Sequence, residues 1–484
     1  MKFSTAYSTA RLFNHVAMAA NTIPLHCQTD RLAKILIEKT QLDNNWNFAN
    51  RSAKLSTPLS TFVRDEAQCV HTSARVFLNC FVPKKCKTNS IMDPAKLKHI
   101  ILNARHPYVV TNADPDWACF RQSFAEWCEA FDLAHPDCAP FEGCPLKGGN
   151  HPQWEWERTK VKMKMRDICT PTDTRWNSFS YRNIALLPEP CRRGINFACF
   201  GFPEVEQDVT FWIGSAQAHT PCHYDTYGCN VVVQVFGRKS WILLPPDAKL
   251  TPVRVPFEES SVYCEENFYS PASYGPFTAV EDKVYHVVLE PGMALIVPPK
   301  WWHYVETLEP ALNFNTWLGL ETDVDSLISE CITKLLLQDL CSDVPERVTS
   351  RLINPNEDLP TTEESVSESY QILNYLLNQR RNNKRQSSNL KRYPCEYLPV
   401  EAFGQLVDEC KPFIKPVELL DRCDFNNLIN RNRARNDPSY RDKISDELTV
   451  DELERIARLR KMVNVCCKPD VVKLIERVLL DETS

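Results

Sequence analysis

Short apolar segments, separated by turn residues, dominate the middle of the chain. Their lengths and composition predict strands at residues 211–214, 230–236, 240–244, 284–289, 293–297 and 312–318. Gly237, Pro245-Pro246 and Pro291-Gly292 mark turns between them. Many short strands without intervening helices are typical of an antiparallel barrel-like sandwich, and we expect a jelly roll.

Helical spacing of apolar residues appears on both sides of these strands. Leu97, Ile100 and Ile101 predict a helix after Asp93, and the apolar stripe of residues 324–336 predicts a clear amphipathic helix. Further helices are predicted near residues 365–378, 399–410, 447–463 and 469–480. The pattern therefore predicts an α+β chain whose C-terminal helices cover the barrel or mediate a homodimer.

These changes of pattern divide the chain into four expected parts. Residues 1–91 carry more Lys and Arg than acidic residues and show no sustained periodicity, so we expect a poorly ordered N-terminal extension. Residues 92–165 are expected to form a mixed α/β segment and residues 166–335 the jelly-roll domain. Residues 336–484 form the helical C-terminal region, with a basic linker near 380–392.

Two segments within these parts suggest surfaces or loops with a function. Residues 247–283 contain several Pro, Glu and Tyr residues and are predicted to be a long functional loop. Residues 158–166 alternate basic with other side chains, which predicts a strand with one fully basic side. That side is either the charged face of an edge strand or a basic rim that faces a substrate.

Composition limits the class of protein. The 484 residues are 43% hydrophobic and 24% charged, which is typical of a globular protein with two or three domains. A net charge of −6 argues against general nucleic-acid binding, and no run of eighteen apolar residues predicts a membrane span. The 21 cysteines are scattered and odd in number, which predicts reduced thiols and a cytoplasmic location, with the nucleus as a second site.

Three residues of the strand-rich region predict a metal centre. His223 and Asp225 are two residues apart on a strand, so their side chains point to the same face of a sheet. His303 can complete a face of two histidines and one carboxylate, which holds ferrous iron and leaves coordination positions open. Cys222 and Cys229 flank the motif and are interpreted as packing residues, because the triad is already complete.

The segments around these residues resemble a known family. They are Thr-Pro-Cys-His-Tyr-Asp at 220–225, the strand and Phe-Gly-Arg-Lys at 230–239, Trp-Trp-His-Tyr at 301–304, and Asn-Thr-Trp at 315–317. Over residues 200–320 the chain resembles the JmjC family of iron- and 2-oxoglutarate-dependent oxygenases. Within that family it is most similar to the small-heat-shock-protein-associated protein 1 group.

The resemblance implies a cupin-like double-stranded β-helix that binds Fe(II) through the triad, with 2-oxoglutarate and O2 as co-substrates. It also implies Lys239 as the cation for the far carboxylate of 2-oxoglutarate, with Thr220 as its hydroxyl partner. Asn230 and Asn315 match positions that hydrogen-bond the co-substrate. Arg238 is the competing cation.

The activity implied by the resemblance is a dioxygenase that couples decarboxylation of 2-oxoglutarate to hydroxylation of a protein side chain. Demethylation, through hydroxylation of an N-methyl group, is the second activity that the resemblance implies. A rival of a different class is a scaffold that binds a small heat-shock protein in a stress response. A third is an RNA nucleoside hydroxylase, which the basic strand 158–166 favours and the acidic net charge opposes.

Overall fold

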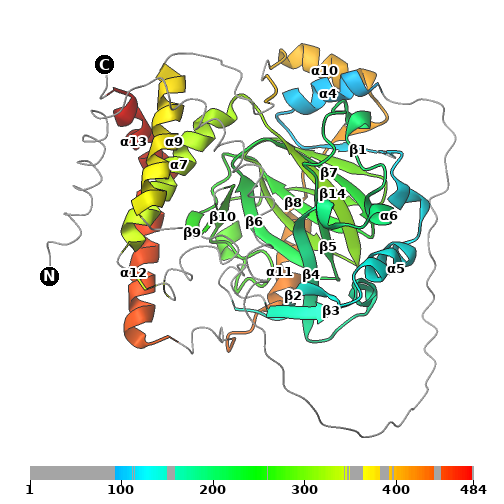
Figure 1. Cartoon of the computed structure of the whole chain (residues 1–484), viewed down its shortest axis with the longest axis horizontal. Coiled ribbons are helices and arrows are strands. Elements are labelled where there is room, and N and C mark those ends of the chain that lie inside the picture. Colours follow the sequence, from blue (N-terminus) through cyan, green and yellow to red (C-terminus); the bar gives the residue numbers. More distant parts are fainter. Residues whose placement is uncertain are drawn as a thin grey trace, which may run out of the picture. The chain divides into compact units, whose positions relative to one another are not determined.

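The computed structural model describes residues 93–481, apart from residues 112, 114, 150–158, 259, 343, 346–347, 349–362, 382–391, 395–396 and 441–447. The expected N-terminal extension and most of the expected basic linker lie outside the described residues. The described elements are two β-sheets with helices around them (Figure 1). No described helix combines the length and the apolar character that crossing a membrane requires.

Two antiparallel sheets form the core of the described part. The large sheet consists, in spatial order, of β15 (Ile414–Pro416), β1 (Tyr108–Val110), β12 (Ala294–Val297), β7 (Cys229–Phe236), β14 (Ala311–Leu318), β5 (Thr210–Gly214), β4 (Arg175–Asn183), β2 (Ala139–Pro145) and β3 (Thr159–Met163). The small sheet consists of β11 (Tyr285–Leu289), β8 (Lys239–Leu244), β13 (Trp302–Thr307), β6 (His219–Asp225), β10 (Ser261–Cys264) and β9 (Pro252–Glu258). The six predicted strands are confirmed as β5, β7, β8, β11, β12 and β14.

The inner faces of the two sheets enclose a space that we call the lumen. Val232 and Leu295 of the large sheet pack there against Trp241, Leu243 and Val305 of the small sheet. The opposite face of the large sheet is also covered, by the helices that precede the barrel. Because both faces of β7 are buried, its sequence is a continuous run of valines and not an alternating pattern.

The helices are placed as follows: α4 (Pro94–Asn103), α5 (Phe124–Ala134), α6 (Glu189–Arg192), α7 (Asp323–Cys341), α9 (Glu363–Arg381), α10 (Val400–Glu409), α11 (Arg422–Asn432), α12 (Val450–Cys466) and α13 (Pro469–Asp481). The predicted first helix is confirmed as α4. The Asp93 side chain caps it by accepting a hydrogen bond from the Ala95 N–H, and Leu97, Ile100 and Ile101 are buried.

The expected loop at 247–283 needs a correction. It contributes β9 and β10, which extend the small sheet beyond β6. Proline suggested a loop because it cannot donate to a ladder, but β9 is an edge strand, where proline such as Pro252 is tolerated. The basic segment, in contrast, was interpreted correctly as part of an edge strand. It contains β3, which lies at one edge of the large sheet.

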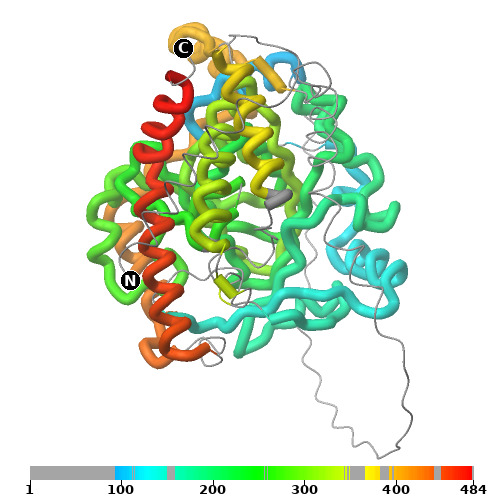
Figure 2. The backbone as a smooth tube through the Cα atoms, turned by 60° about the vertical axis from the view of Figure 1, so that its left-hand side comes forward, coloured from blue at the N-terminus to red at the C-terminus, as the bar shows by residue number. Residues whose placement is uncertain are grey.

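The apolar stripe of α7 is covered within the chain. Ile328 and Leu335 are 0% and 6% exposed and pack in one cluster with residues of α9 and α13, such as Leu373 and Val472. Figure 2 shows α7, α9 and α13 running side by side. This cluster therefore needs no second subunit to bury it, and the expected boundary at 335–336 falls inside α7.

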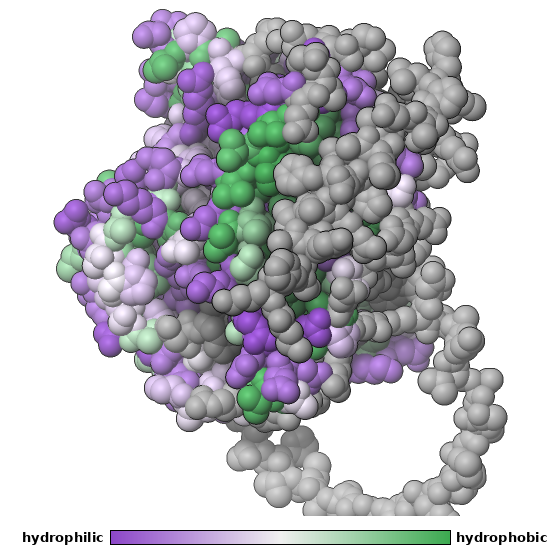
Figure 3. Space-filling view, turned by 90° about the vertical axis from the view of Figure 1, so that its left-hand side faces the viewer, coloured by the Kyte–Doolittle hydropathy of each residue, from purple (hydrophilic) through white to green (hydrophobic). Residues whose placement is uncertain are grey.

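The C-terminal region does more than form a helical layer. The short strand β15 pairs with β1 at the edge of the large sheet, and Phe425 and Ile429 of α11 pack on the outer face of the small sheet. An apolar patch remains on the surface of α12 and α13, where Met462, Val465 and Leu474 are 41%, 48% and 53% exposed; Figure 3 shows apolar side chains on this side.

Candidate metal centre

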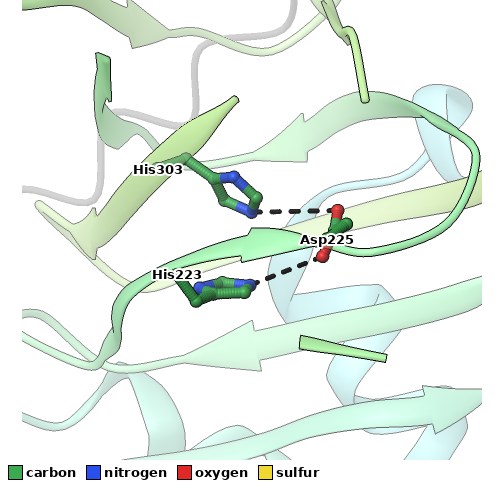
Figure 4. A group of neighbouring side chains, drawn as sticks. All are labelled: His223, Asp225 and His303. Carbon is green, nitrogen blue, oxygen red and sulfur yellow. Dashed lines mark ion pairs between the residues drawn. The ribbon is translucent and has the colours of Figure 1, made fainter. Parts of the chain in front are cut away.

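The three predicted ligands meet on the inner face of the small sheet. β6 and β13 are antiparallel neighbours, and their register sets His223 directly opposite His303. The Nε2 atom of His223 lies 3.6 Å from Oδ1 of Asp225, and Nε2 of His303 lies 3.9 Å from Oδ2 (Figure 4). All three side chains are buried, and their ligand atoms lie within 4.8 Å of one another. Among the described residues, no other group of His, Cys, Asp and Glu side chains converges in this way.

A β-bulge explains how Thr220 joins the same face. Thr220 pairs with Val305, whereas His223 pairs with His303, so three residue steps on β6 match two on β13. The extra residue in β6 reverses the alternation of side chains between the two positions. Thr220 therefore shares a face with His223 although an odd number of residues separates them.

Backbone carbonyls orient both imidazole rings. Nδ1 of His223 lies 2.8 Å from the Pro221 carbonyl, and Nδ1 of His303 lies 2.9 Å from the Trp301 carbonyl. Each carbonyl can accept a hydrogen bond only from a protonated Nδ1, which leaves the lone pair of a neutral ring on Nε2. Both Nε2 atoms face Asp225, so each ring, when neutral, presents its Nε2 lone pair to the place where the carboxylate lies.

The Asp225 carboxylate is held by a chain of hydrogen bonds from the large sheet. Its Oδ2 accepts from Trp317 Nε1 at 2.8 Å and from Asn230 Nδ2 at 3.2 Å. Asn315 Nδ2 donates to Asn230 Oδ1 at 2.9 Å, and Trp212 Nε1 donates to Asn315 Oδ1 at 2.8 Å. An indole N–H can only donate, so Trp212 fixes the orientation of both amides and directs the last donor at Asp225.

The electrostatics of the triad suit a metal ligand set. Burial alone would raise the pKa of Asp225, but His303, His223 and the Trp317 N–H outweigh it and lower that pKa to about 2. Burial, together with the neighbouring His223, lowers the pKa of His303 to about 4. Burial lowers the pKa of His223 as well, but the hydrogen bond and charge of Asp225 outweigh it and leave a raised pKa. The carboxylate is therefore ionised and the His303 ring neutral at pH 7.

The turn between Asp225 and Asn230 is held by residues that follow the barrel strands in the sequence, Leu318 and Asp323. Gly228 has φ +70°, and a Cβ there would lie 2.9 Å from the Leu318 carbonyl oxygen, so a larger residue would strain the turn. The Gly228 N–H donates to Asp323 at the start of α7, at 3.0 Å. Helix α7 thus anchors the loop that follows the metal-ligand strand.

Lys239 and Arg238 have opposite environments. Lys239 is buried, and its alternation with Trp241, whose ring stacks on that of His303 at 5.8 Å, places it on the lumen face of β8. Burial lowers the pKa of Lys239 to about 7, and it has no hydrogen bond or ion pair within the described residues. Arg238 is half-exposed and donates to both Glu309 oxygens at 3.1 and 3.2 Å.

Sequence reasoning missed several residues around the triad. Trp212 was not predicted to donate to Asn315. The pairing of β5 with β14, which sets Trp212 opposite Asn313 and two residues from Asn315, would have been needed to predict it. Tyr263 was hidden in the expected loop. Its ring lies 5.6 Å from that of His223, and its hydroxyl donates to Glu258 at 2.5 Å. The hydrogen bonds of Asn230 and Asn315 serve Asp225, and their contact with a co-substrate stays a prediction.

The comparisons with known proteins agree with this fold. Residues 170–319 match the cupin-like domain family. The chain is 44% identical over 294 residues to HSPB1-associated protein 1 of Bos taurus, which covers 56% of this chain and 60% of that protein. It is 43% identical over 287 residues to the Homo sapiens protein of the same name, covering 54% and 58%. It is also 36% identical over 262 residues to Jumonji C domain-containing protein 5 of Drosophila melanogaster, covering 50% and 61%.

These matches confirm two of the expectations from the sequence. The resemblance to JmjC proteins and to the small-heat-shock-protein-associated group is found again, and the cupin-like match agrees with a jelly roll of the α+β class. The chain spans about three fifths of the length of the mammalian relatives that it matches.

Proposed function

We propose that this chain is a dioxygenase that depends on Fe(II) and 2-oxoglutarate and hydroxylates a side chain of another protein. The observation that carries the proposal is the buried set of two imidazole Nε2 atoms and one ionised carboxylate on neighbouring strands. When bound, iron and 2-oxoglutarate would supply the activation of O2 and the oxidative decarboxylation that this family of reactions requires. The residues of the chain would hold, orient and shield these groups.

The donor set fits a divalent metal. His223 and His303 offer Nε2 lone pairs, and Asp225 offers an oxygen whose second contacts are already fixed by Trp317 and Asn230. Such outer contacts set the direction of a ligand before the metal arrives. A site with one carboxylate leaves part of the metal charge uncancelled, so an anionic co-substrate can still bind.

The lumen also fits a dicarboxylate. A buried ammonium without a partner is costly, and the depressed pKa of Lys239 shows that cost in the structure. A carboxylate placed beside Lys239 would offset it through a charge-assisted hydrogen bond. Thr220 lies on the same sheet face, and the buried Trp241 indole N–H has no partner within the described residues, which leaves a second donor in the lumen.

A scaffold protein is the main rival. The names of the mammalian relatives state an association with HSPB1, a small heat-shock protein, and we carry a partner of that class over to this chain as part of the proposal. Protein binding alone does not require a buried lysine, which lowers stability, or two imidazole rings oriented towards one carboxylate. Those features favour catalysis, with partner binding as a second property of the same protein.

The RNA alternative is weaker in the structure. Lys160 on the basic side of β3 pairs with Glu142 at 2.7 Å, Lys164 donates to the Pro136 carbonyl at 2.6 Å, and Arg166 pairs with Asp132 at 2.8 Å. Side chains already paired within the chain are poorer phosphate contacts, because each must exchange one partner for another. N-methyl groups on protein lysines remain the second substrate class that the same chemistry would serve.

The experiment that tests the proposal measures succinate made from 2-oxoglutarate by the full chain with iron and ascorbate, first alone and then with candidate peptides. We expect slow succinate formation alone, stimulation by a substrate peptide, and a mass gain of one oxygen on that peptide. Lys239→Met should reduce turnover at low 2-oxoglutarate, whereas Arg238→Met should not. An iron-loaded, folded protein that makes no succinate under any of these conditions would support the scaffold.

A further inference from the structure

Two cysteines face each other directly behind the metal-ligand strand. The register of β10 on β6 pairs Tyr263 with His223, which sets Cys264 opposite Cys222 one residue further along. Both side chains are buried, at 2% and 3% exposure, and lie in the same apolar cluster on the outer face of the small sheet. Cys222 therefore packs in an apolar cluster, as expected from the sequence, and also lies beside a second thiol.

The positions of the two residues match the geometry of a disulfide. Directly opposed residues of an antiparallel pair have Cα atoms about 4.5–5.5 Å apart, within the range of about 4.4–6.8 Å that a disulfide spans. The Cys264 thiol donates to the Glu266 carbonyl at 3.6 Å, and Cys222 lies close enough to contribute, after burial, to the raised pKa of Cys264. Cys229, which flanks the triad on its other side, instead has its thiol directed at the backbone carbonyls of Ile101 and Val297.

A small pocket is lined by both cysteines. It is also lined by residues of β6, β13 and the segment after β10, namely His219, Asn267, Tyr269 and Tyr304. Its free space is about that of one water-sized molecule. A small oxidant therefore fits between these side chains better than a bulky disulfide reagent such as oxidised glutathione.

We propose that Cys222 and Cys264 are an oxidisable thiol pair, and that hydrogen peroxide closes them to a disulfide which disturbs the metal centre. One thiol sulfur attacks a peroxide oxygen, the O–O bond breaks, and a sulfenic acid and one water form. The second thiol attacks that sulfur, the S–O bond breaks, and a second water leaves. Two thiols lose two electrons and two protons, and one peroxide molecule accepts them.

The disturbance follows from chain connectivity. Cys222 is bonded to His223, and Tyr263, whose ring lies against that of His223, is bonded to Cys264. A covalent link between the two strands therefore constrains the His223 ring and its neighbour Tyr263 at once. Only this second consequence rests on the proposed metal-dependent function, since the disulfide itself can be observed without any metal.

The test treats the folded full chain with hydrogen peroxide before metal is added, blocks the remaining thiols, and maps the linked peptides by mass spectrometry. Cys199, Cys222 and Cys229 share one tryptic peptide, so chymotrypsin is needed to cut at Tyr224. We expect a link between Cys222 and Cys264 that dithiothreitol reverses, and that Cys264→Ser and Cys222→Ser abolish. Cys229→Ser is the matched control and should leave the link intact.

A second measurement follows Mn²⁺ binding by electron paramagnetic resonance after the peroxide is removed. We expect binding severalfold weaker in the oxidised protein, restored by dithiothreitol, and insensitive to peroxide in Cys264→Ser. If the exposed Cys169 and Cys423 oxidise fully while Cys222 and Cys264 stay reduced, the thiol pair is not a redox site. A complete disulfide with unchanged Mn²⁺ binding would overturn the coupling to the metal centre. A chain that makes no succinate but forms the link would contradict the proposed function alone.

Discussion

The lumen of the barrel and the cluster between α7, α9 and α13 are both buried, but they are built from opposite chemistry. The helical cluster joins apolar side chains such as Ile328 and Val472, and each finds its contacts inside the chain. The lumen contains apolar residues too, but among them lies an ionised carboxylate, and neither the Lys239 amine nor the Trp241 indole N–H has a partner within the described residues.

The difference separates what stabilises the chain from what the chain does. Apolar contacts gain free energy wherever water is excluded, so the helical cluster needs no ligand. Buried polar groups cost free energy unless they are paired, so the Lys239 amine and the Trp241 N–H of the lumen favour the proposed binding of a ligand there. Substitutions in the two regions should therefore have separable effects on unfolding and on binding.

The largest effect is expected in the helical cluster. Replacing Ile328 and Leu335 together with aspartate removes two buried apolar side chains and buries two charges. Each deletion of such a side chain costs about 2–5 kcal/mol, before the added cost of the charge. The melting temperature should fall steeply or the protein should fail to fold. The matched control is Leu474→Asp on the exposed patch of α13, which should change stability by less than about 0.5 kcal/mol.

Any double variant that stays folded should still turn over 2-oxoglutarate, because none of the described residues of this cluster belongs to the triad. An unchanged melting temperature would contradict the observed burial of the stripe. A folded variant without succinate formation would show that the two regions are not separable.

The next effect concerns Lys239, the buried lysine of the lumen. Lys239→Met removes a charge-assisted hydrogen bond worth about 1.5–3 kcal/mol, so the affinity for 2-oxoglutarate should fall about tenfold to a hundredfold. Arg238→Met removes a neighbouring cation that is engaged in a surface ion pair, and should change this affinity little. Calorimetric titration of both variants decides between them. A larger loss for Arg238→Met would mean that the wrong cation has been assigned.

A graded effect is expected along the hydrogen-bond chain to Asp225. Trp317→Phe removes a direct donor to the carboxylate and should weaken metal binding about 10- to 100-fold, as losses of outer contacts do. Trp212→Phe removes the donor that orients Asn315, two side chains away from the carboxylate, so its effect should be smaller. Metal titrations of the two variants measure the order. Equal effects would show that the chain does not transmit orientation.

The last effect is a dependence on pH. The pKa of Lys239 is about 7 in the folded chain and that of an unfolded lysine about 10.5. Between these values the unfolded state binds more protons, so the stability of the chain without co-substrate should rise with pH across that window. A bound carboxylate favours the ammonium, so binding of 2-oxoglutarate above pH 7 should take up a proton. Calorimetry in buffers of different ionisation enthalpy detects this uptake, which Lys239→Met should lack.

Part of this arrangement could be predicted from the sequence, because it depends on local pattern. The strands followed from short apolar runs and turns, and the pairing of His223 with Asp225 followed from the period of a strand. The bulge that brings Thr220 to the same face could not be foreseen, because it is set by the register with β13. The edge strand β9 was missed because an edge position tolerates residues that elsewhere mark loops, and its neighbour β10 was missed with it.

The covering of α7 was beyond the sequence for a related reason. An apolar stripe shows that a helix face is buried and carries no information about which element buries it. The barrel and a second subunit were the two candidates, whereas the structure covers the stripe with α9 and α13. Likewise the hydrogen bonds of Asn230 and Asn315 link strands that are distant in sequence, and only the folded sheet shows that they end on Asp225.

The most direct test of the metal centre compares iron content in the purified full chain, in Asp225→Ala and in Asp208→Ala. Asp225 supplies the only carboxylate of the triad, whereas Asp208 is an exposed aspartate whose side chain has no part in it. We predict about one ferrous ion per chain for the parent and for Asp208→Ala, and almost none for a folded Asp225→Ala. Full iron content in Asp225→Ala would contradict the assignment of the triad and, with it, the proposed oxygenase.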